Sequence, residues 1–206
     1  KLRQASDLEA IHTLGFRGEA LAAISSVSRI DLLTKTADAR LGVSLHLEAG
    51  KVMQREEAGC PDGTTIIVRD LFFNTPARMK FMKRDSVEGS ALLAAVQRLA
   101  VAHPEVSFRV IKDGEEQLHT SGDGQLLGAI YAVFGRQVAK EMIPVDSHWE
   151  KNALTGFVSR PTATRGTRAN QLFFVNGRHI RSKTLTAALE EAYRNRMMVG
   201  RFPSCV

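Results

Sequence analysis

Close to the start of the chain, two glycines flank an arginine in a segment whose residue types suit phosphate binding. The segment consists of Gly15, Phe16, Arg17, Gly18, Glu19, Ala20 and Leu21. Glycine lets the backbone approach a ligand closely, and the free N–H groups and dipole of a helix start attract an anion. Such an arrangement can cradle phosphate groups. The segment contains neither a Walker loop nor a dinucleotide fingerprint, so by itself it favours an ordinary loop before a helix.

The whole net positive charge of the chain lies in its second part. Residues 1–121 contain 16 basic and 16 acidic residues, whereas residues 122–206 contain 12 basic and 6 acidic residues. No acid lies between Glu150 and Glu190, a stretch that contains Lys151, Arg160, Arg165, Arg168, Arg178, Arg181 and Lys183. This asymmetry predicts a polyanion such as nucleic acid as a partner. An ordinary solvated basic face is the alternative, because surface charge raises association without proving it.

Several classes of site and location are disfavoured. Cys60 and Cys205 are the only cysteines, which predicts free thiols in a reducing compartment rather than a disulfide framework. The six histidines are scattered, so we expect no zinc or other metal site. No apolar run approaches the roughly 20 residues of a membrane helix, and no secretory signal follows Lys1. Because the first residue is not Met, we expect an internal piece of a longer protein.

The hydrophobic patterns predict a mixed α and β chain. Helices are expected at residues 7–12, 18–28, 85–102, 125–134 and 185–197, and the second of them is expected to be buried because small and apolar residues dominate it. Strands are expected at residues 29–35, 41–47, 64–68, 106–111, 153–159 and 171–176. A small polar stretch at 120–124 coincides with the change in charge balance. We therefore expect one domain over residues 1–121 and a second over residues 122–206.

Short signals predict where individual elements turn or end. Asp113-Gly114 indicates a hairpin and Asn176-Gly177 a tight turn, because these residue types tolerate positive φ. Gly135 is expected to end the helix before it. Either Ser182 or Thr184 is expected to cap the last helix.

Four segments, in the same order along the chain, resemble motifs of one family. Residues 13–21 look like the third ATP-binding motif of the MutL family, which belongs to the GHKL ATPases together with gyrase B, Hsp90-type chaperones and histidine kinases. Gly63-Thr64 before a strand resembles the fourth GHKL motif. Residues 70–81 are similar to the signature that separates MutL from its GHKL relatives, and residues 174–178 resemble the VNGR element of the family's second domain. On these motifs the chain is identified as a member of the MutL family.

The resemblance implies a fold and a nucleotide site. The fold is α+β: the later part of a GHKL ATPase α/β sandwich, followed by a smaller α/β second domain with a ribosomal-protein-like fold. The backbone of Gly15 to Leu21 would wrap the phosphates of ATP as part of a lid, and Lys1 would lie at the nucleotide. Thr64 would hydrogen-bond near the adenine, directly or through water, although strand propensity alone would explain a threonine there.

The resemblance also implies a function and partners. It implies an ATP-dependent switch in DNA mismatch repair that couples mismatch recognition to strand processing, with ATP, and magnesium in the intact parent, as cofactors. The partners would be duplex or single-stranded DNA, a second MutL subunit, a MutS-type mismatch sensor and a downstream nuclease or helicase, with no membrane. Sequence-independent DNA contacts would come from Arg178, Arg181, Lys183, Arg160, Arg165 and Arg168. The location would be the bacterial cytoplasm at the nucleoid, or the nucleus in a eukaryote.

Residues 70–81 favour a structural role, with no chemical one assigned. Phe72, Phe73 and Phe81 suit a core, and Asn74-Thr75-Pro76 suits a turn that begins the next helix. Few aromatic residues interleave the basic ones further along the chain, and no recognition helix is evident. That composition argues against base readout and against a single-strand stacking platform.

The resemblance to the family is incomplete. The general-base Glu, the magnesium-binding Asn and the downstream lysine for the γ-phosphate have no counterpart in these 206 residues, so no catalytic residue is assigned. Hydrolysis needs an oriented water and charge neutralisation, and we expect none from this chain alone. Two alternatives stay open: a DNA-binding and assembly module without catalysis, and another GHKL ATPase of the gyrase type. Residues 70–81 and the VNGR element argue against the latter.

Overall fold

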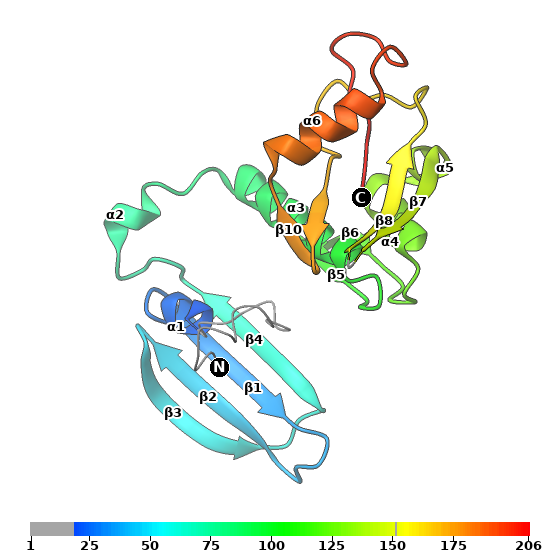
Figure 1. The fold of residues 1–206 in the computed structure, drawn as a ribbon. Coiled ribbons are helices and arrows are strands. Elements are labelled where there is room, and N and C mark those ends of the chain that lie inside the picture. The colour runs from blue at the N-terminus through cyan, green and yellow to red at the C-terminus, as the bar shows by residue number, and fades with distance from the viewer. Residues whose placement is uncertain (1–18, 151) are drawn as a thin grey trace. The chain divides into compact units, whose positions relative to one another are not determined.

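The structure is a computed structural model that describes residues 19–150 and 152–206. The chain forms two compact units, one up to Arg84 and the other from Asp85 onward. Each unit combines helices with antiparallel strands (Figure 1). The helix expected at residues 7–12 lies outside the described residues.

The first unit is built on a four-stranded antiparallel sheet in the order β3-β2-β1-β4. Its strands are β1 (Arg29–Lys35), β2 (Gly42–Glu48), β3 (Lys51–Ala58) and β4 (Gly63–Arg69). Strands β1, β2 and β4 confirm the sequence prediction. Strand β3 was missed because it is an edge strand, exposed along most of its length, and its polar composition hides the period of two.

The helix before the sheet, α1 (Ala20–Ser25), is shorter and more exposed than predicted. Its apolar residues led us to expect a buried helix, but the side chains of Leu21 and Ile24 are 43% and 41% exposed. The helix packs on its own unit through its C-terminal end, where Ser25 and Val27 are buried. The prediction of burial was therefore wrong for the described residues, because no described element of this unit covers the remainder of α1.

Residues 70–81 form a turn followed by the short helix α2 (Pro76–Met79). Thr75 is the N-cap and Pro76 the first helical residue, as the sequence predicted. Phe73 is half-buried, with the guanidinium of Arg29 4.3 Å from its ring centre. Phe81 is 86% exposed, so the expected core position was wrong. It follows the end of α2, where no described element packs on it.

Paired charges link three strands of this sheet. Nδ1 of His46 on β2 lies 2.6 Å from Oδ1 of Asp31 on β1, and Arg69 on β4 pairs with the same carboxylate. The hydrogen bond from His46, and then that from Arg69, lower the pKa of Asp31. The bond to Asp31 raises the pKa of His46. Each pair joins neighbouring strands side chain to side chain, in addition to the backbone ladder.

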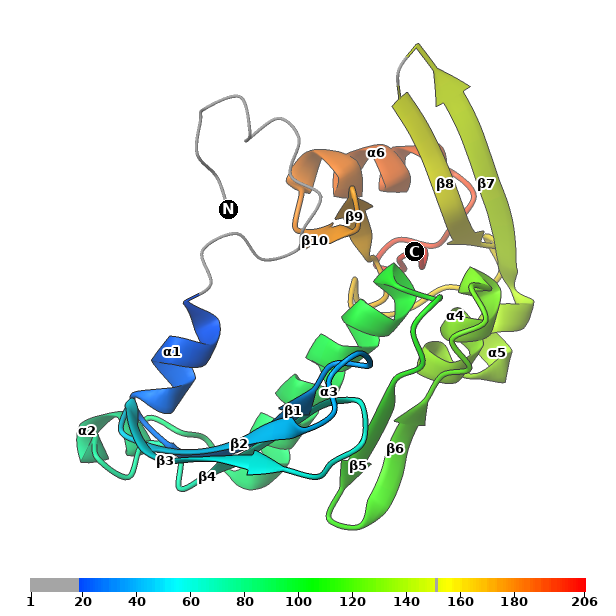
Figure 2. The ribbon, with the colours of Figure 1, turned by 90° about the horizontal axis from the view of Figure 1, so that it is seen from below.

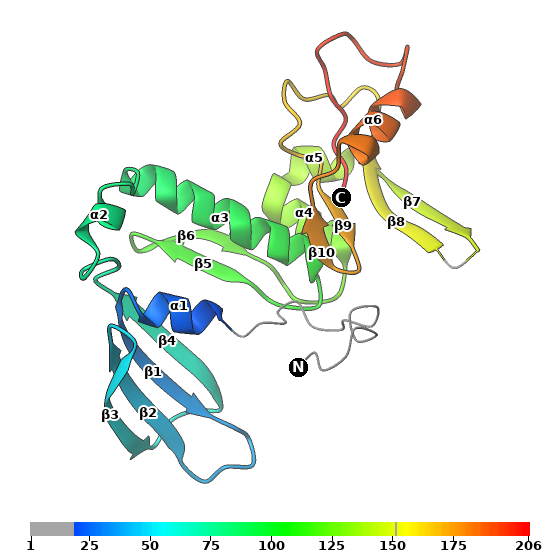
Figure 3. The ribbon, with the colours of Figure 1, turned by 60° about the vertical axis from the view of Figure 1, so that its left-hand side comes forward.

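The second unit begins with a long helix, α3 (Asp85–Ala102), which packs along a hairpin of β5 (Arg109–Lys112) and β6 (Glu115–His119), as Figure 3 shows. Asp113 and Gly114 have φ values of 53° and 82°, so the predicted Asp-Gly hairpin turn is confirmed. The helix ends just before His103-Pro104, as expected for a residue that precedes proline.

Two helices follow the hairpin and form the core with α3. Helices α4 (Leu126–Phe134) and α5 (Arg136–Lys140) are separated by Gly135, whose φ of 82° confirms the predicted helix stop. One cluster of buried side chains joins Val101 of α3, Ala129 of α4 and Leu172. A second cluster centres on Ile130, which is fully buried.

The compact units do not divide at the expected boundary near residue 121. That position lies between β6 and α4, inside the second unit, where α3 packs on α4 and on the β5–β6 hairpin. The composition changes there, but the apolar contacts run across it. As a division between the family's domains, residues 1–121 and 122–206 stay a prediction.

A longer hairpin and the last residues of the chain complete the sheet elements of this unit. Strands β7 (Met142–Trp149) and β8 (Asn152–Ser159) pair along their whole length (Figure 2). Strand β8 was predicted, whereas β7 was missed because proline and charged residues interrupt its apolar pattern. The backbone of Val206 pairs with Phe157, and the carbonyl of Cys205 accepts a 3.0 Å hydrogen bond from Leu172.

The VNGR element forms a short hairpin of β9 (Phe173–Val175) and β10 (Arg178–Ile180). Asn176 and Gly177 have φ values of 48° and 75°, which confirms the predicted tight turn. Helix α6 (Lys183–Ala192) comes next and ends five residues before the predicted Met197.

Side chains fix the start of α6 and the loop that packs beside it. The hydroxyl of Ser182 accepts a 3.2 Å hydrogen bond from the N–H of Leu185, so Ser182 rather than Thr184 is the cap. The guanidinium of Arg168 binds both carboxylate oxygens of Glu190, at 2.6 and 3.0 Å, and lies 4.0 Å from the ring centre of Phe202. This bidentate contact braces the loop at 160–170 against α6.

Replacement of Ser182 tests how much the helix cap contributes to the stability of the fold. Ser182→Ala removes the acceptor for the N–H of Leu185, and we expect the free energy of unfolding to fall by about 1 kcal/mol. Thr184→Ala, inside the first turn, is the matched control and should change it less. Urea denaturation of both variants measures the difference, and an equal effect of the two would contradict the assignment of Ser182.

The brace at Arg168 predicts a pH-dependent stability. Its hydrogen bond is the main cause that lowers the pKa of Glu190 from 4.5, so the pair stabilises the fold above about pH 4.5 and loses this contribution as the pH falls through the lowered pKa. We expect Glu190→Gln to lower the urea midpoint at neutral pH, and the midpoints of variant and wild type to converge in acid. Glu191→Gln, which breaks a surface pair with Arg194, is the control. A midpoint difference that persists in acid would refute the ionic brace.

Candidate functional site

A cavity of about 870 Å³ opens in the second unit between α3, the β9–β10 hairpin and one side of α6. We call it the cationic groove. Its charged and titratable lining residues are Arg98, Arg168, His179, Arg181, Lys183 and Glu190. Glu190 is the only carboxylate among the described residues of the lining, and Arg168 already neutralises it. The groove therefore carries a strong excess of positive charge.

The pKa of His179 is affected by this positive charge. Burial lowers the pKa of His179, and the charges of Arg98 and Arg181 lower it further. Within the described part of the chain, no carboxylate forms an ion pair with Arg98, Arg181 or Lys183. Uncompensated cations that converge on one cavity are the arrangement that binds phosphates without regard to base sequence.

The structure brings together only some of the basic residues singled out in the sequence. Arg168, Arg181 and Lys183 line the cationic groove, whereas Arg160 and Arg178 are not in its lining. Arg160 follows β8, where its backbone N–H donates to Glu141.

Sequence reasoning missed two groove residues. Arg98 comes from α3, more than 80 positions before Arg181, and no local pattern connects the two. His179 follows the VNGR motif directly and could have been found from that position. Its ring packs edge-on against Phe174, with ring centres 5.6 Å apart.

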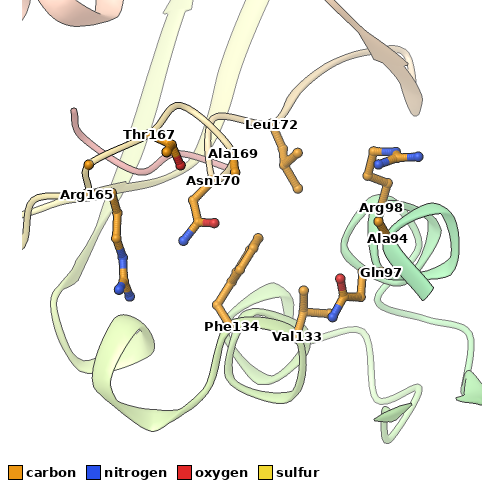
Figure 4. Close-up of a pocket in the computed structure, with 11 residues that line it drawn as sticks. Ala94, Gln97, Arg98, Val133, Phe134, Arg165, Thr167, Ala169, Asn170 and Leu172 are labelled. Carbon is orange, nitrogen blue, oxygen red and sulfur yellow. The ribbon is translucent and has the colours of Figure 1, made fainter. Parts of the chain in front are cut away.

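A second cavity, of about 530 Å³, lies between α3, α4 and the loop at 165–172 (Figure 4). Arg165, the remaining predicted contact, lines this cavity. Its wall includes Val133 and Phe134 of α4. It shares Ala94, Arg98, Ala169 and Leu172 with the cationic groove, so the two cavities adjoin along one wall.

The segment expected to hold phosphates is described only from Glu19 onward. Lys1, Gly15, Phe16, Arg17 and Gly18 lie outside the described residues. Glu19 is the N-cap of α1 and makes no side-chain capping bond, and Ala20 and Leu21 begin the helix. The N–H groups of that first turn have no partner within the helix, which is the property that makes a helix start attractive to anions.

Thr64 lies at the start of β4 and is exposed. Its Oγ1 atom is 2.8 Å from Oγ1 of Thr34, which faces it on β1, and the Thr34 hydroxyl also contacts the carbonyl of Gly63 at 3.2 Å. A hydroxyl has one proton, so if Thr34 donates to the carbonyl, Thr64 donates to Thr34 and keeps a free acceptor. Thr34 was missed because only the strand register reveals the pair.

Other classes of site find no support in the described part of the chain. No group of three histidine, cysteine or acidic residues there is arranged to hold a metal ion. No helix among those residues is long and apolar enough to cross a membrane. Cys60 and Cys205 are both free, and burial raises the pKa of Cys205 to about 12.

Comparisons with known proteins agree on one family. Residues 130–206 match the family described as DNA mismatch repair protein, C-terminal domain. The DNA mismatch repair protein MutL of Agathobacter rectalis is 44% identical over the whole chain, which spans 32% of that protein. MutL of Desulforudis audaxviator is 49% identical over 98% of the chain and is covered to 36%. The chain thus spans about a third of the length of these curated relatives.

Solved structures give the same result. The Aquifex aeolicus MutL ATPase domain complexed with ADP matches 98% of the chain with a TM-score of 0.73 at 28% identity, and 75% of that domain is covered. The ATPase domain of the mismatch repair endonuclease MutL of the same organism matches with a TM-score of 0.68 at 25% identity. The mixed α/β fold is therefore similar to that of MutL ATPase domains, and the chain belongs to the MutL family of DNA mismatch repair proteins.

Proposed function

We propose that this chain is part of an ATP-driven switch in DNA mismatch repair, which couples mismatch recognition to strand processing. The similarity to a MutL ATPase domain that binds ADP supports nucleotide binding by the longer protein. In this proposal residues 1–121 are the later part of a GHKL sandwich. Residues 122–206 belong to a second domain with a ribosomal-protein-like fold.

The nucleotide would lie between the start of α1 and the start of β4. Lys1 and the backbone of residues 15–21 would hold the phosphates, helped by the free N–H groups of the first turn of α1. Thr64 would accept a hydrogen bond near the adenine, directly or through water, with its hydroxyl oriented by Thr34. Hydrolysis also needs a general base and a metal ligand, and no residue of this chain is assigned to either role.

DNA would bind in the cationic groove, and this groove is the observation that carries the proposal. Arg98 comes from α3, Arg181 from the link between β10 and α6, and Lys183 from α6. The three converge, and among the described residues none of them has a carboxylate partner. Their contacts would be with phosphates, so binding would depend on salt and not on base sequence. Arg168 would act mainly as a brace, because Glu190 occupies its guanidinium.

The γ-phosphate of ATP would couple nucleotide binding to DNA binding in this switch. Ordering of a lid by bound nucleotide is a common device in such proteins. It would bring two MutL subunits together over DNA, in response to a MutS-type mismatch sensor, and recruit a nuclease or helicase. A DNA-binding and assembly module without catalysis is the alternative for this chain by itself, because the cationic groove lies entirely in the second unit.

The salt dependence of DNA affinity tests the groove. Arg181→Gln should lower the slope of log affinity against log salt by about 0.9 for duplex DNA if this guanidinium neutralises one phosphate. Arg136→Gln on α5 removes the same charge outside the groove and should leave the slope near its wild-type value. Fluorescence anisotropy with a labelled duplex gives both slopes. Identical slopes for wild type and Arg181→Gln would exclude this phosphate contact.

The hydroxyl pair at Thr34 and Thr64 can be tested in a longer MutL protein that contains this chain. Thr64→Val removes the acceptor and should weaken ATP binding by about tenfold, the effect of one hydrogen bond of roughly 1.4 kcal/mol. Thr64→Ser should retain most of the affinity. Isothermal titration with a non-hydrolysable ATP analogue measures both, and equal losses for Val and Ser would argue against a hydroxyl contact. The 206 residues alone should give no ATP turnover.

A further inference from the structure

We propose that the second cavity, which we call the Phe134 pocket, accepts one unstacked nucleotide of a DNA strand. The strand's backbone would continue into the cationic groove. The inference rests on the proposed DNA binding and deepens it, because it assigns one nucleotide of a strand to a defined cavity beside the cationic groove. The evidence is the chemistry of the pocket lining and its junction with the groove.

One side of the Phe134 pocket is apolar. Val133 and Phe134 from the end of α4 and Leu172 from the segment before β9 line it together (Figure 4). All three side chains also contact the core cluster around Val101 and Ala129, so the wall is held in place by packing. A nucleobase has an apolar face that gains free energy from such a wall, whatever the base.

Polar groups in the same lining suit the edge of a base. The carboxamides of Gln97 and Asn170 each offer donors and an acceptor. In the described part of the structure neither side chain has a recorded hydrogen-bond partner, so both are available to a ligand. The combination of two free carboxamides with an apolar wall distinguishes this pocket from a plain cationic surface.

Two guanidiniums complete the chemistry of a nucleotide site. Arg165 and Arg98 lie on opposite sides of the pocket in Figure 4, and no carboxylate is found among the described residues that line it. Guanidinium groups match the geometry of phosphate oxygens. The pocket volume of about 530 Å³ lies within the range of small-ligand cavities, which suits one nucleotide and excludes a duplex.

The shared wall supplies the path of the strand. Arg98 lines both cavities, so a phosphate bound there would have the groove on one side and the pocket on the other. A base in a duplex is paired and stacked and would have to be extruded at a cost of a few kcal/mol, whereas a single strand offers unstacked bases. Single-stranded DNA should therefore use both cavities and a duplex only the groove. The sequence argues against stacking because few aromatic residues interleave the basic ones between Glu150 and Glu190, and Phe134 lies outside that stretch.

A double variant separates the two cavities. Gln97→Ala/Asn170→Ala removes the base-edge contacts and leaves every groove residue in place. We expect its affinity for a single-stranded oligonucleotide to fall about a hundredfold, because each lost hydrogen bond lowers it about tenfold, and its affinity for a duplex to stay within twofold. Gln137→Ala/Asn152→Ala, with the same residue types outside both linings, is the control. Anisotropy titrations at one salt concentration measure all affinities.

A second variant guards against a folding defect. Thr167→Trp fills the Phe134 pocket from an exposed loop position that does not line the groove, and it should also weaken single-strand binding selectively. If the affinities for single-stranded and duplex DNA fall equally, or if neither falls, the nucleotide pocket is refuted, whereas DNA binding in the groove is not. If the wild-type chain binds neither form, the proposed DNA function itself fails. Displacement of the strand by free deoxyadenosine monophosphate at micromolar concentration would instead assign the pocket to a free nucleotide.

Discussion

The packing of α3 on α4 and Leu172 is the constraint on which the second unit depends. Val101, Ala129 and Leu172 come from three distant parts of the chain and are buried together. Arg98 precedes Val101 by one helical turn, so the burial of one side chain fixes the position of the other. The apolar contact thereby places a charge from α3 beside charges that follow β10 and begin α6. Both cavities exist because of this junction.

The same junction explains why the positive charges remain available. Like charges that converge repel each other. Burial lowers the pKa of His179 most, and repulsion by Arg98 and Arg181 lowers it further. Packing of the apolar side chains offsets this cost, while the contact between Arg168 and Glu190 holds the loop that closes the groove. Arg168 thus holds the loop in place, whereas Arg181 and Lys183 are exposed and Arg98 is half-buried. A polyanion is the ligand that would relieve their repulsion.

Local chemistry could be predicted from the sequence, and long-range contacts could not. Positive φ at Asn176-Gly177, the helix stop at Gly135 and the cap of α6 follow from neighbouring residues, and the structure has them. The pairing of Thr34 with Thr64, and the meeting of Arg98 with Arg181, depend on strand register and helix packing that no short pattern encodes. The exposure of α1 and Phe81 was missed for the same reason, because apolar composition shows that a residue can be buried but not what would bury it.

The strand order of the first unit has a consequence for how the two residues of the proposed nucleotide contact, Thr34 and Thr64, come together. Strands β1, β2 and β3 are joined by successive hairpins, whereas β4 pairs with β1 and so encloses the β2–β3 hairpin within the loop it closes. Non-local pairing of this kind forms late, because chain entropy is lost before contacts reward it. We therefore expect the pairing of β4 with β1, which brings Thr64 beside Thr34, to form after the two hairpins. A ligand that contacts both Thr34 and Thr64 would bind only when β4 is paired with β1. By mass action, bound nucleotide would therefore stabilise this strand pairing, in addition to ordering a lid.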